Sequence, residues 1–288
     1  MITKNAYAKI NLTLEIREKR EDGYHNIRSV MQKVSLSDTI DFEILDEEKI
    51  ILTCDVNVCA PEDNLAYKAA AGYLERYKTA TGKSFGVKIH IKKVIPDKAG
   101  LAGGSADCAC VLDTLYKTFG GIDYTAVEEI AASLGSDINF CLDKYRCALC
   151  TDRGIVLEKC TPYDGENIII CVPDYGMKTS DIYRAFDASP ILYDDDPSTV
   201  VKNLLNGGKQ HEIYPYTVNS FAPICERECA DITEIKDTMK SHGALAAQMS
   251  GSGSSVYGIF ASDEEMKKCY TELIKKYKKC YCCKTVTE

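Results

Sequence analysis

The sequence lacks the features that define several common classes of protein. No run of about 18 apolar residues, the length of a membrane-spanning helix, occurs anywhere in the chain. The first residues contain no apolar core of signal-peptide length. Basic residues are in the minority, with 35 Lys and Arg against 43 Asp and Glu and a net charge of −8. General nucleic-acid binding needs clustered Lys and Arg, so we expect a cytoplasmic protein that binds neither nucleic acid nor membranes.

Cysteine, in contrast, is abundant, but the fifteen cysteines form no recognisable framework. Their number is odd, the chain is long and no export signal is present, which together favour a reducing compartment. The densest group is Cys280, Cys282 and Cys283, and no second Cys or His pair stands at zinc spacing from it. We therefore interpret the cysteines as structural or incidental thiols and assign no metal ligands among them.

The most informative stretch of the sequence predicts a strand, a glycine-rich loop and a helix in succession. Val87, Ile89 and Ile91 alternate with polar residues, which is typical of a half-buried strand. The loop at 96–105 follows, and apolar residues then recur near a 3.6-residue period until Gly120. The start of such a helix presents unpaired N–H groups and the positive end of the helix dipole, and both attract anions.

Three glycines make this loop suitable for binding phosphate. Gly100, Gly103 and Gly104 let the backbone approach an anion without a Cβ in the way. Ser105 places a hydroxyl at the start of the helix. The loop is neither a P-loop, which needs Gly-Lys followed by Ser or Thr, nor a Rossmann loop, whose glycine spacing differs. An ordinary tight turn between a strand and a helix would also use glycine, so the glycines alone leave both interpretations open.

The remaining sequence alternates predicted strands and helices, enough for one large domain or two modest ones at about 100–200 residues per domain. Asn64 is the expected N-cap of a helix to about residue 79, and Thr125 with Glu128 predicts a capping box for a helix over 126–134. The Asp-Asp-Asp-Pro run at 194–197 indicates a solvated turn.

We place a domain boundary near residue 160. Further strands are expected at 7–16, 30–36, 39–45 and 168–172, around 249–253 and at the C-terminal end, and further helices at 179–186, from about 232 to 243, and at 263–278.

Three other features carry chemical groups but are weak signals one at a time. Lys9 lies within the first predicted strand, where an isolated lysine is usually a solvent-facing charge. Asp137 follows a predicted helix end at Gly135, where an aspartate is more often a solvated or capping carboxylate. The segment Asp22–His25, Asp-Gly-Tyr-His, usually marks only a hairpin turn. Their joint occurrence is the informative observation.

Taken together, these segments resemble the superfamily of galactokinase, homoserine kinase, mevalonate kinase and phosphomevalonate kinase, the GHMP kinases. The resemblance spans nearly the whole chain in the order of the family. Within the superfamily, the Lys-x-Asn strand followed by Asp-Gly-Tyr-His resembles the member that phosphorylates a cytidylyl-linked alcohol. The segments that carry the resemblance are Ala8–Leu12, Asp22–His25, Pro96–Asp107, Leu134–Asp137, Met249–Ser254 and, more weakly, Pro61–Ala66.

The resemblance implies a two-domain α+β kinase. Residues 1–160 would form a ribosomal-protein-S5-like α/β domain that binds the nucleotide. Residues 161–288 would form a ferredoxin-like α+β domain on the substrate side, with the active site in the cleft between the two. The implied reaction transfers the γ-phosphate of ATP to the 2-hydroxyl of cytidine diphosphate-linked methylerythritol, a step of the non-mevalonate route to isoprenoid precursors.

The resemblance also assigns roles to individual residues. Asp137 takes the position of the catalytic carboxylate and Lys9 that of its paired lysine. Tyr24 and His25 take the positions that recognise cytosine, and Asn11 that of a substrate contact. A carboxylate there would orient the acceptor hydroxyl or accept its proton, and a neighbouring lysine would keep it ionised. The nucleotide-binding positions are Asn64 and the loop residues Pro96, Asp97, Lys98, Ala99, Gly100, Leu101, Ala102, Gly103, Gly104, Ser105 and Ala106.

Mg²⁺ is expected to bridge the ATP phosphates, with Ser105 as a candidate ligand and no carboxylate assigned. The family often has Gly-Arg-Gly-Glu where this chain has Asp152-Arg153-Gly154-Ile155, which leaves the role of that segment unresolved. One alternative is another kinase of the superfamily, acting on homoserine, mevalonate or a sugar, and Asp22–His25 argues against it. A second is a catalytically silent nucleotide-binding regulator, and the presence of both Lys9 and Asp137 argues against that. The sequence does not indicate an oligomeric state.

Overall fold

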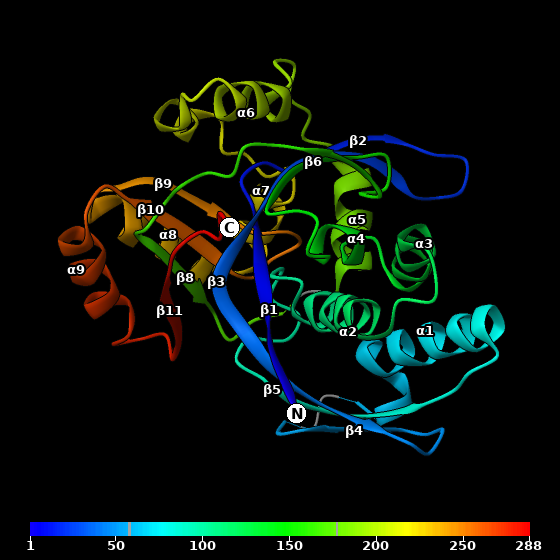
Figure 1. Ribbon diagram of the computed structural model, residues 1–288. Coiled ribbons are helices and arrows are strands. Elements are labelled where there is room, and N and C mark those ends of the chain that lie inside the picture. Colours follow the sequence, from blue (N-terminus) through cyan, green and yellow to red (C-terminus); the bar gives the residue numbers. More distant parts are fainter. Residues whose placement is uncertain (57–58, 177) are drawn as a thin grey trace. The chain divides into compact units, whose positions relative to one another are not determined.

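The computed structural model describes residues 1–56, 59–176 and 178–288 (Figure 1). Contacts divide them into two compact units, which we call unit 1 and unit 2. The boundary near residue 160 stays a prediction, because these units follow contacts and are interleaved along the chain. Unit 1 consists of Met1–Ala8, Ser37–Asp97 and Ala102–Tyr145, and unit 2 of Lys9–Leu36, Lys98–Leu101 and Arg146–Glu288.

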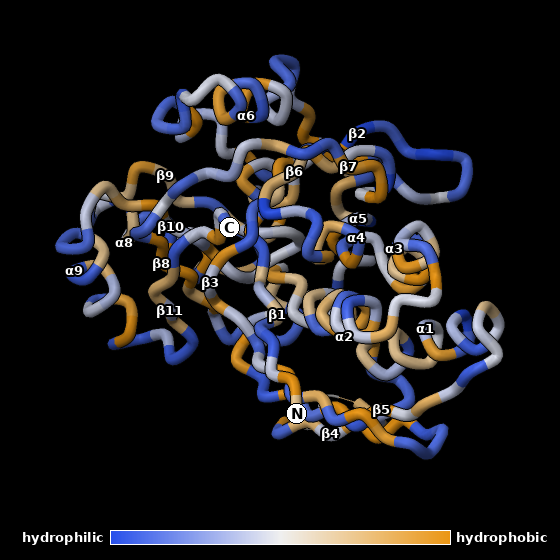
Figure 2. Tube along the Cα trace, viewed as in Figure 1, coloured by the Kyte–Doolittle hydropathy of each residue, from blue (hydrophilic) through white to orange (hydrophobic). Residues whose placement is uncertain are grey.

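The sheet of unit 1 is built around β5 (Gly86–Lys92). β4 (Ile50–Cys54) pairs with β5 in parallel, and the C-terminal part of β3 (His25–Leu45) pairs with it antiparallel. Figure 2 shows apolar residues along both β4 and β5. The alternation predicted for β5 is confirmed, because the side chains on one of its faces are fully buried. These residues are Val87, Ile89 and Ile91.

Helices complete unit 1. α1 (Leu65–Thr81) and α2 (Gly103–Phe119) pack against each other, as Figure 1 shows, and both contact α3 (Tyr124–Leu134). The short helix α4 (Ile138–Cys141) contacts α2 and α3, and the 3-10 turn η1 (Pro61–Asp63) leads into α1. Asn64 caps α1 as predicted, since its side chain accepts a hydrogen bond from the Ala66 N–H at 2.9 Å.

Unit 2 contains a four-stranded antiparallel sheet in the order β11-β8-β10-β9. Every residue of β8 and β10 is buried, as expected for the two central strands. Helix α8 packs on β9 and β10, and helix α9 packs on β11 and β8. The bounds are β8 (Ile168–Val172), β9 (Ala244–Met249), β10 (Val256–Phe260), β11 (Lys279–Cys283), α8 (Ala230–Ser241) and α9 (Asp263–Leu273).

A second set of strands in unit 2 surrounds the N-terminal part of β3, which pairs with β2 and β6, while β7 pairs with β6. The turn between β2 and β3 is hydrophilic (Figure 2), and its polar side chains face solvent. The first strand, β1 (Ile2–Asn11), begins in unit 1 and ends in unit 2. The other elements are β2 (Glu15–Lys19), β6 (Cys147–Thr151), β7 (Val156–Lys159), α5 (Thr179–Ala188), α6 (Pro197–Asn206), α7 (Ala222–Glu228), η2 (Gln210–Glu212) and η3 (Tyr214–Tyr216).

Two strand predictions were wrong. The strands expected at 30–36 and 39–45 are one continuous strand, β3. The polar pair between them does not interrupt the strand, because the side chain of Asp38 is fully buried and accepts hydrogen bonds from the backbone after β5. The strand expected at 7–16 is divided between β1 and β2. Residues 11–16 are all buried, so the alternation of polar and apolar residues there does not mark a solvent-facing side of one strand.

Two helix starts also differ from the prediction. The expected capping box of α3 does not form, because the N-cap is Asp123 and Thr125 lies inside the helix. The polar run at 194–197 is not only a solvated turn. It begins α6, in which Asp196 is the N-cap, its side chain accepts a hydrogen bond from the Thr199 N–H, and Pro197 occupies the first turn. The α9 helix ends at Leu273, about one turn before the predicted end.

No helix among the described residues is long and apolar enough to cross a membrane. All fifteen cysteines are free thiols, and most of them are buried. Within the described ranges, no group of three or more His, Cys, Asp or Glu side chains is arranged to hold a metal ion.

Candidate active site

The glycine-rich loop connects β5 to α2 and contributes residues to both units. Residues 96–97 and 102–106 belong to unit 1, and Lys98–Leu101 to unit 2. Its backbone enters the left-handed region at Lys98 (φ 52°), Gly100 (φ 76°) and Ala102 (φ 57°). Such a φ is unfavourable for residues other than glycine, so the surrounding structure imposes this conformation. Ala102 is the N-cap of α2 and has no side chain that could cap the first N–H groups, which leaves them available to an anion.

Within unit 1, a buried cluster of charges ties the end of β5 to the start of α2. Asp38 Oδ1 accepts hydrogen bonds from the backbone N–H groups of Val94 and Ile95, at 2.6 and 2.8 Å. Lys93 Nζ lies 2.5 Å from Asp38 Oδ2 and 2.8 Å from Asp107 Oδ2 on α2. The cluster therefore ties the residues just before the glycine-rich loop to the helix that follows the loop, and all of these residues belong to unit 1. Sequence reasoning missed it, because charged residues at 38, 93 and 107 form no motif.

The electrostatics of this cluster are those of one partly buried cation between two buried carboxylates. Burial raises the pKa of Asp107 to about 7, opposed by the Lys93 ammonium and reinforced by the Asp38 carboxylate. Burial lowers the pKa of Lys93, but the two carboxylates outweigh it and the net shift is upward. Asp107 Oδ1 is buried and has no hydrogen-bond partner among the described residues. Ionised Asp107 is therefore costly in this environment.

The three loop glycines serve different purposes. A Cβ on Gly103 would lie 2.9 Å from a side-chain carbon of Ile95, so this glycine is needed for close packing inside unit 1. A Cβ on Gly100 would lie 2.1 Å from the carbonyl oxygen of Ser250, so this one is needed where the late Ser-Gly loop approaches in unit 2. Gly104 is exposed, and the nearest atom to its Cβ position, on Leu65, is 3.7 Å away. Only Gly104 has room beside it for a ligand.

Lys9 is held by a buried hydrogen-bond network in unit 2. Its Nζ donates to Asn11 Oδ1 at 2.7 Å, and Asn11 Nδ2 donates to Ser29 Oγ at 2.7 Å. Ser250 Oγ accepts from the Asn11 N–H at 3.2 Å and donates to the Gly100 carbonyl at 3.0 Å. Lys9 is 3% exposed and Asn11 only 1%. The structure thus brings the predicted Lys9 and Asn11 together with part of the glycine-rich loop, and Asn11 contacts Lys9 directly.

Asp137 lies in unit 1, at the N-cap position of α4. It is half-buried, and its backbone carbonyl accepts a hydrogen bond from the Cys141 N–H. Its side chain makes no capping hydrogen bond to the helix. The capping role that an aspartate commonly has at this position is therefore not the reason for its presence.

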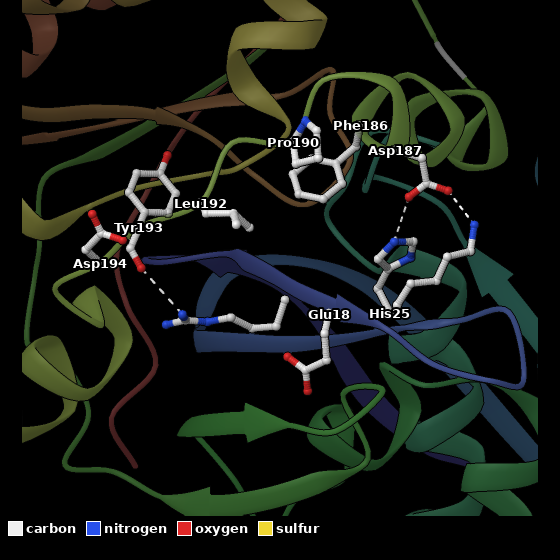
Figure 3. Close-up of a pocket in the computed structure, with 10 residues that line it drawn as sticks. Glu18, His25, Phe186, Asp187, Pro190, Leu192, Tyr193 and Asp194 are labelled. Atoms are coloured by element: carbon white, nitrogen blue, oxygen red, sulfur yellow. Dashed lines mark hydrogen bonds and ion pairs between the residues drawn. The ribbon is translucent and has the colours of Figure 1, made fainter.

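His25 lines a pocket of about 630 Å³ in unit 2 (Figure 3). Its side chain is 5% exposed, and Nε2 lies 2.8 Å from Asp187 Oδ1. The ring stacks on Tyr183, with centroids 5.1 Å apart, and meets the edge of Phe186 at 6.0 Å. The rest of the pocket comes from β2 and from the segment 186–194. Sequence reasoning missed the three partners of His25 on α5, because aromatic residues at helical spacing usually indicate a buried helix face.

Tyr24 has a different environment from His25. Its side chain is 59% exposed and is not among the described residues that line the pocket. The guanidinium of Arg153 lies 5.0 Å from the centre of the Tyr24 ring, a cation–π arrangement. Asp152 pairs with Arg20 in the same turn region. The segment that departs from the family pattern therefore packs on the Asp-Gly-Tyr-His turn.

Comparison with known proteins gives consistent results over the whole chain. Two family models match, GHMP kinases N terminal domain at residues 64–144 and GHMP kinases C terminal at residues 209–279. The 4-diphosphocytidyl-2-C-methyl-D-erythritol kinase of Caldicellulosiruptor saccharolyticus is 38% identical over 95% of this chain and 92% of its own length. The kinase of the same name from Clostridium beijerinckii is 36% identical over 98% of this chain and 99% of its own length.

Solved structures of related kinases are similar to this chain over nearly its whole length. The crystal structure of a 4-(cytidine 5′-diphospho)-2C-methyl-D-erythritol kinase superposes with a TM-score of 0.83 at 28% identity and covers 99% of both chains. The L. major mevalonate kinase in complex with R-mevalonate has a TM-score of 0.72 at 15% identity, over 100% of this chain and 97% of its own. At that identity the second similarity concerns the fold alone.

Proposed function

The chain belongs to the GHMP kinases, and from this membership we propose that it transfers the γ-phosphate of ATP to the 2-hydroxyl of 4-diphosphocytidyl-2-C-methyl-D-erythritol. The observation that carries the proposal is the near-full-length similarity, at 38% identity, to a relative whose name states that substrate. A kinase of this family uses ATP and acts on a small molecule. The reaction would belong to the non-mevalonate route to isoprenoid precursors.

We assign Asp137 to the acceptor hydroxyl. Phosphoryl transfer depends mainly on positioning and on stabilisation of charge, so a carboxylate that orients the hydroxyl or accepts its proton is the chief contribution from the protein. The support for this assignment is the resemblance, in which Asp137 takes the position of the catalytic carboxylate, together with its half-buried place at the N-cap position of α4.

Lys9 is assigned to the same reaction as the cation that stabilises negative charge near the reacting oxygens. Its support is the buried network in which Asn11, Ser29 and Ser250 fix its ammonium group. An ammonium held in this way loses little conformational freedom when the substrate binds. The contact between Asn11 and the substrate stays a prediction. The contact between Asn11 and Lys9 indicates an indirect role through the lysine.

The ATP phosphates are assigned to the first turn of α2, with the loop 96–106 around them. Asn64 is assigned to the nucleotide as well, because the residue after it, Leu65, lies beside Gly104. Uncapped N–H groups and the exposed Gly104 support this position. Mg²⁺ usually binds through phosphate oxygens, water and few protein groups, so the absence of a cluster of acidic ligands among the described residues fits such an ion. The Ser105 hydroxyl would be its protein ligand, and the ion would neutralise charge on the phosphates.

The cytidylyl group is assigned to the pocket at His25. The imidazole supplies a donor and an acceptor for the edge of a base, and Phe186 supplies an aromatic surface for stacking. Tyr24 is assigned here as well, although its side chain is exposed beside Arg153. Stacking on the base would require it to leave the Arg153 guanidinium.

An assay of ADP release with the intact chain tests the proposed reaction. It compares the cytidylyl methylerythritol substrate with homoserine, mevalonate and galactose, and uses Asp137→Asn as the background control. We expect ATP-dependent turnover of the cytidylyl substrate alone. Turnover of one of the other three alcohols instead would identify a different kinase of the superfamily, and ATP binding without turnover of any of them would identify a regulator.

A further inference from the structure

Asp187 is the shared partner of two side chains at the pocket of unit 2. Figure 3 shows its carboxylate beside the His25 ring, and Lys19 is its second partner. Oδ1 lies 2.8 Å from His25 Nε2, and Oδ2 lies 2.5 Å from Lys19 Nζ. The mechanism described above gives Asp187 no role. Its side chain is 32% exposed, so packing alone does not account for it.

The pair determines which nitrogen of His25 carries a proton. The hydrogen bond from Lys19, opposed by partial burial and assisted by His25, holds the pKa of Asp187 below its usual value. An ionised carboxylate only accepts hydrogen bonds, so the Nε2 of His25 must be the donor. In the neutral imidazole the other nitrogen, Nδ1, is then an acceptor.

Helix α5 also fixes the orientation of the His25 ring. Tyr183 stacks on the imidazole with an interplanar angle of 26°, and the ring of Phe186 is perpendicular to it, at 89°. Asp187 follows on the same helix, so one element contacts the ring through a stacked tyrosine, a perpendicular phenylalanine and the carboxylate at Nε2. Rotation of the ring would break all three contacts, which keeps the donor and the acceptor at fixed positions.

We propose that Asp187 is a positioning residue that determines base specificity, because it holds His25 with Nδ1 as a hydrogen-bond acceptor. Such an acceptor favours a base that offers a donor at that edge, as the 4-amino group of cytosine does. Uracil has a carbonyl oxygen at position 4, and two acceptors would face each other there. This inference rests on the proposed function for the assignment of the pocket to the cytidylyl group.

Competition binding tests the inference without depending on turnover. Cytidine 5′-diphosphate and uridine 5′-diphosphate are titrated against the intact wild-type chain and the Asp187→Asn variant. The asparagine amide both donates and accepts, so it permits either tautomer of His25. We expect the wild type to prefer the cytidine nucleotide and Asp187→Asn to lose about 5–10-fold of this preference, the effect of one hydrogen bond. Equal preference in both proteins would overturn the proposal.

Two further variants isolate the contact that matters. Asp181→Asn changes another aspartate of α5, which pairs with Arg184 away from the pocket, and we expect it to keep the wild-type preference. Lys19→Met removes the second partner of Asp187 and leaves His25 its acceptor, so the preference should again persist. If Lys19→Met alone abolishes the preference, the lysine and not the histidine determines specificity and the proposal is wrong.

The outcomes also separate this inference from the proposed function. The wild type could fail to phosphorylate the cytidylyl substrate and still show a cytidine preference that depends on Asp187. That result would reject the proposed reaction and keep the role of Asp187. The wild type could instead phosphorylate that substrate while Asp187→Asn leaves the preference for the cytidine nucleotide unchanged. That result would reject the role of Asp187 and keep the proposed reaction.

Discussion

The ammonium of Lys9 is almost completely withdrawn from water, and Asn11 Oδ1 lies 2.7 Å from it. A buried charge is costly unless polar groups surround it, and each group that does so must itself be held in place. Ser29 and Ser250 hold Asn11 from two sides. The network therefore fixes the position of Lys9 before any substrate arrives.

The contact between Lys9 and Asn11 was accessible from the sequence, whereas the contacts with Ser29 and Ser250 were not. Side chains at positions i and i+2 of a strand point to the same face, so residues 9 and 11 are neighbours in any strand that contains both. Ser250 is 239 residues from Asn11, and no local pattern links the two.

Replacement of Asp137 by alanine should lower kcat by roughly 10²–10⁴-fold, the usual contribution of a positioned acid–base group. The affinity for ATP should stay unchanged, because the phosphates are assigned to α2. Single-turnover kinetics and nucleotide titration measure the two effects. Asp46→Asn, at an exposed turn of the same unit, is the matched control. Unchanged turnover in Asp137→Ala would remove this residue from the mechanism.

At the scale of elements, the connection from β5 to α2 is constrained at several points by unit 1. Asp38 accepts hydrogen bonds from the backbone just after β5, Lys93 bridges to Asp107 on α2, and Gly103 packs against Ile95. The predicted strand, loop and helix are confirmed. The cluster that holds them was not predictable, because it joins residues of β3, the segment after β5 and α2, and so depends on how the chain folds back.

The different environments of two loop glycines give a paired prediction. Gly100→Ala should destabilise the fold by about 2 kcal/mol or more, because alanine at a left-handed φ costs roughly 1–2 kcal/mol and its Cβ would also overlap the Ser250 carbonyl. Gly104→Ala should leave stability unchanged or slightly higher, since its Cβ position is open and alanine favours a helix.

Urea unfolding measures the stability of both variants, and the KM for ATP reports on function. Gly104→Ala should raise the KM for ATP if the first turn of α2 contacts the phosphates. A stable Gly104→Ala variant with an unchanged KM would place the phosphates elsewhere. A Gly100→Ala variant as stable as the wild type would contradict the close approach of Ser250.

The pKa of Asp107 predicts a pH dependence of stability. Burial raises this pKa to about 7 in the folded chain, whereas an exposed aspartate in the unfolded chain titrates near 3.9. Folding therefore binds a proton between these values, and the stabilisation that the protonated group provides is lost as the pH rises toward and through 7.

Urea unfolding of the wild type and Asp107→Asn from pH 4.5 to 8 tests this prediction. Asparagine does not titrate, so the free energy of unfolding of the wild type, relative to the variant, should fall as the pH rises across this range. The exposed control Asp46→Asn should show no such trend. A constant difference between the wild type and Asp107→Asn would show that Asp107 is not protonated on folding.

At the scale of the whole molecule, the chain passes repeatedly between its two units. Residues 9–36 and 98–101 belong with the C-terminal part of the sequence, although residues on either side of them belong to unit 1. Both β1 and β3 begin in one unit and end in the other. Separation of the chain at a single point would therefore remove strands from at least one unit.

Removal of divalent ions should abolish activity without changing the stability of the fold. Mg²⁺ is expected to accompany the nucleotide, and the described residues contain no metal-holding cluster that stabilises the fold. EDTA should therefore abolish ADP release and leave the melting temperature unchanged, and added Mg²⁺ should restore activity. A large fall in melting temperature with EDTA would instead reveal a structural ion.

The sequence by itself determined the family and most of the elements, but not where β3, α3 and α6 begin or end. The period-2 alternation of β5, the helical spacing of α1 and α2, the N-cap Asn64 and the glycine-rich loop are local patterns, and each depends on residues only a few positions apart. The tertiary structure alone decided which distant groups meet. Asp38 with Lys93 and Asp107, Asn11 with Ser250, and His25 with Asp187 are contacts between segments that no local spacing relates, because they depend on how the chain returns to itself.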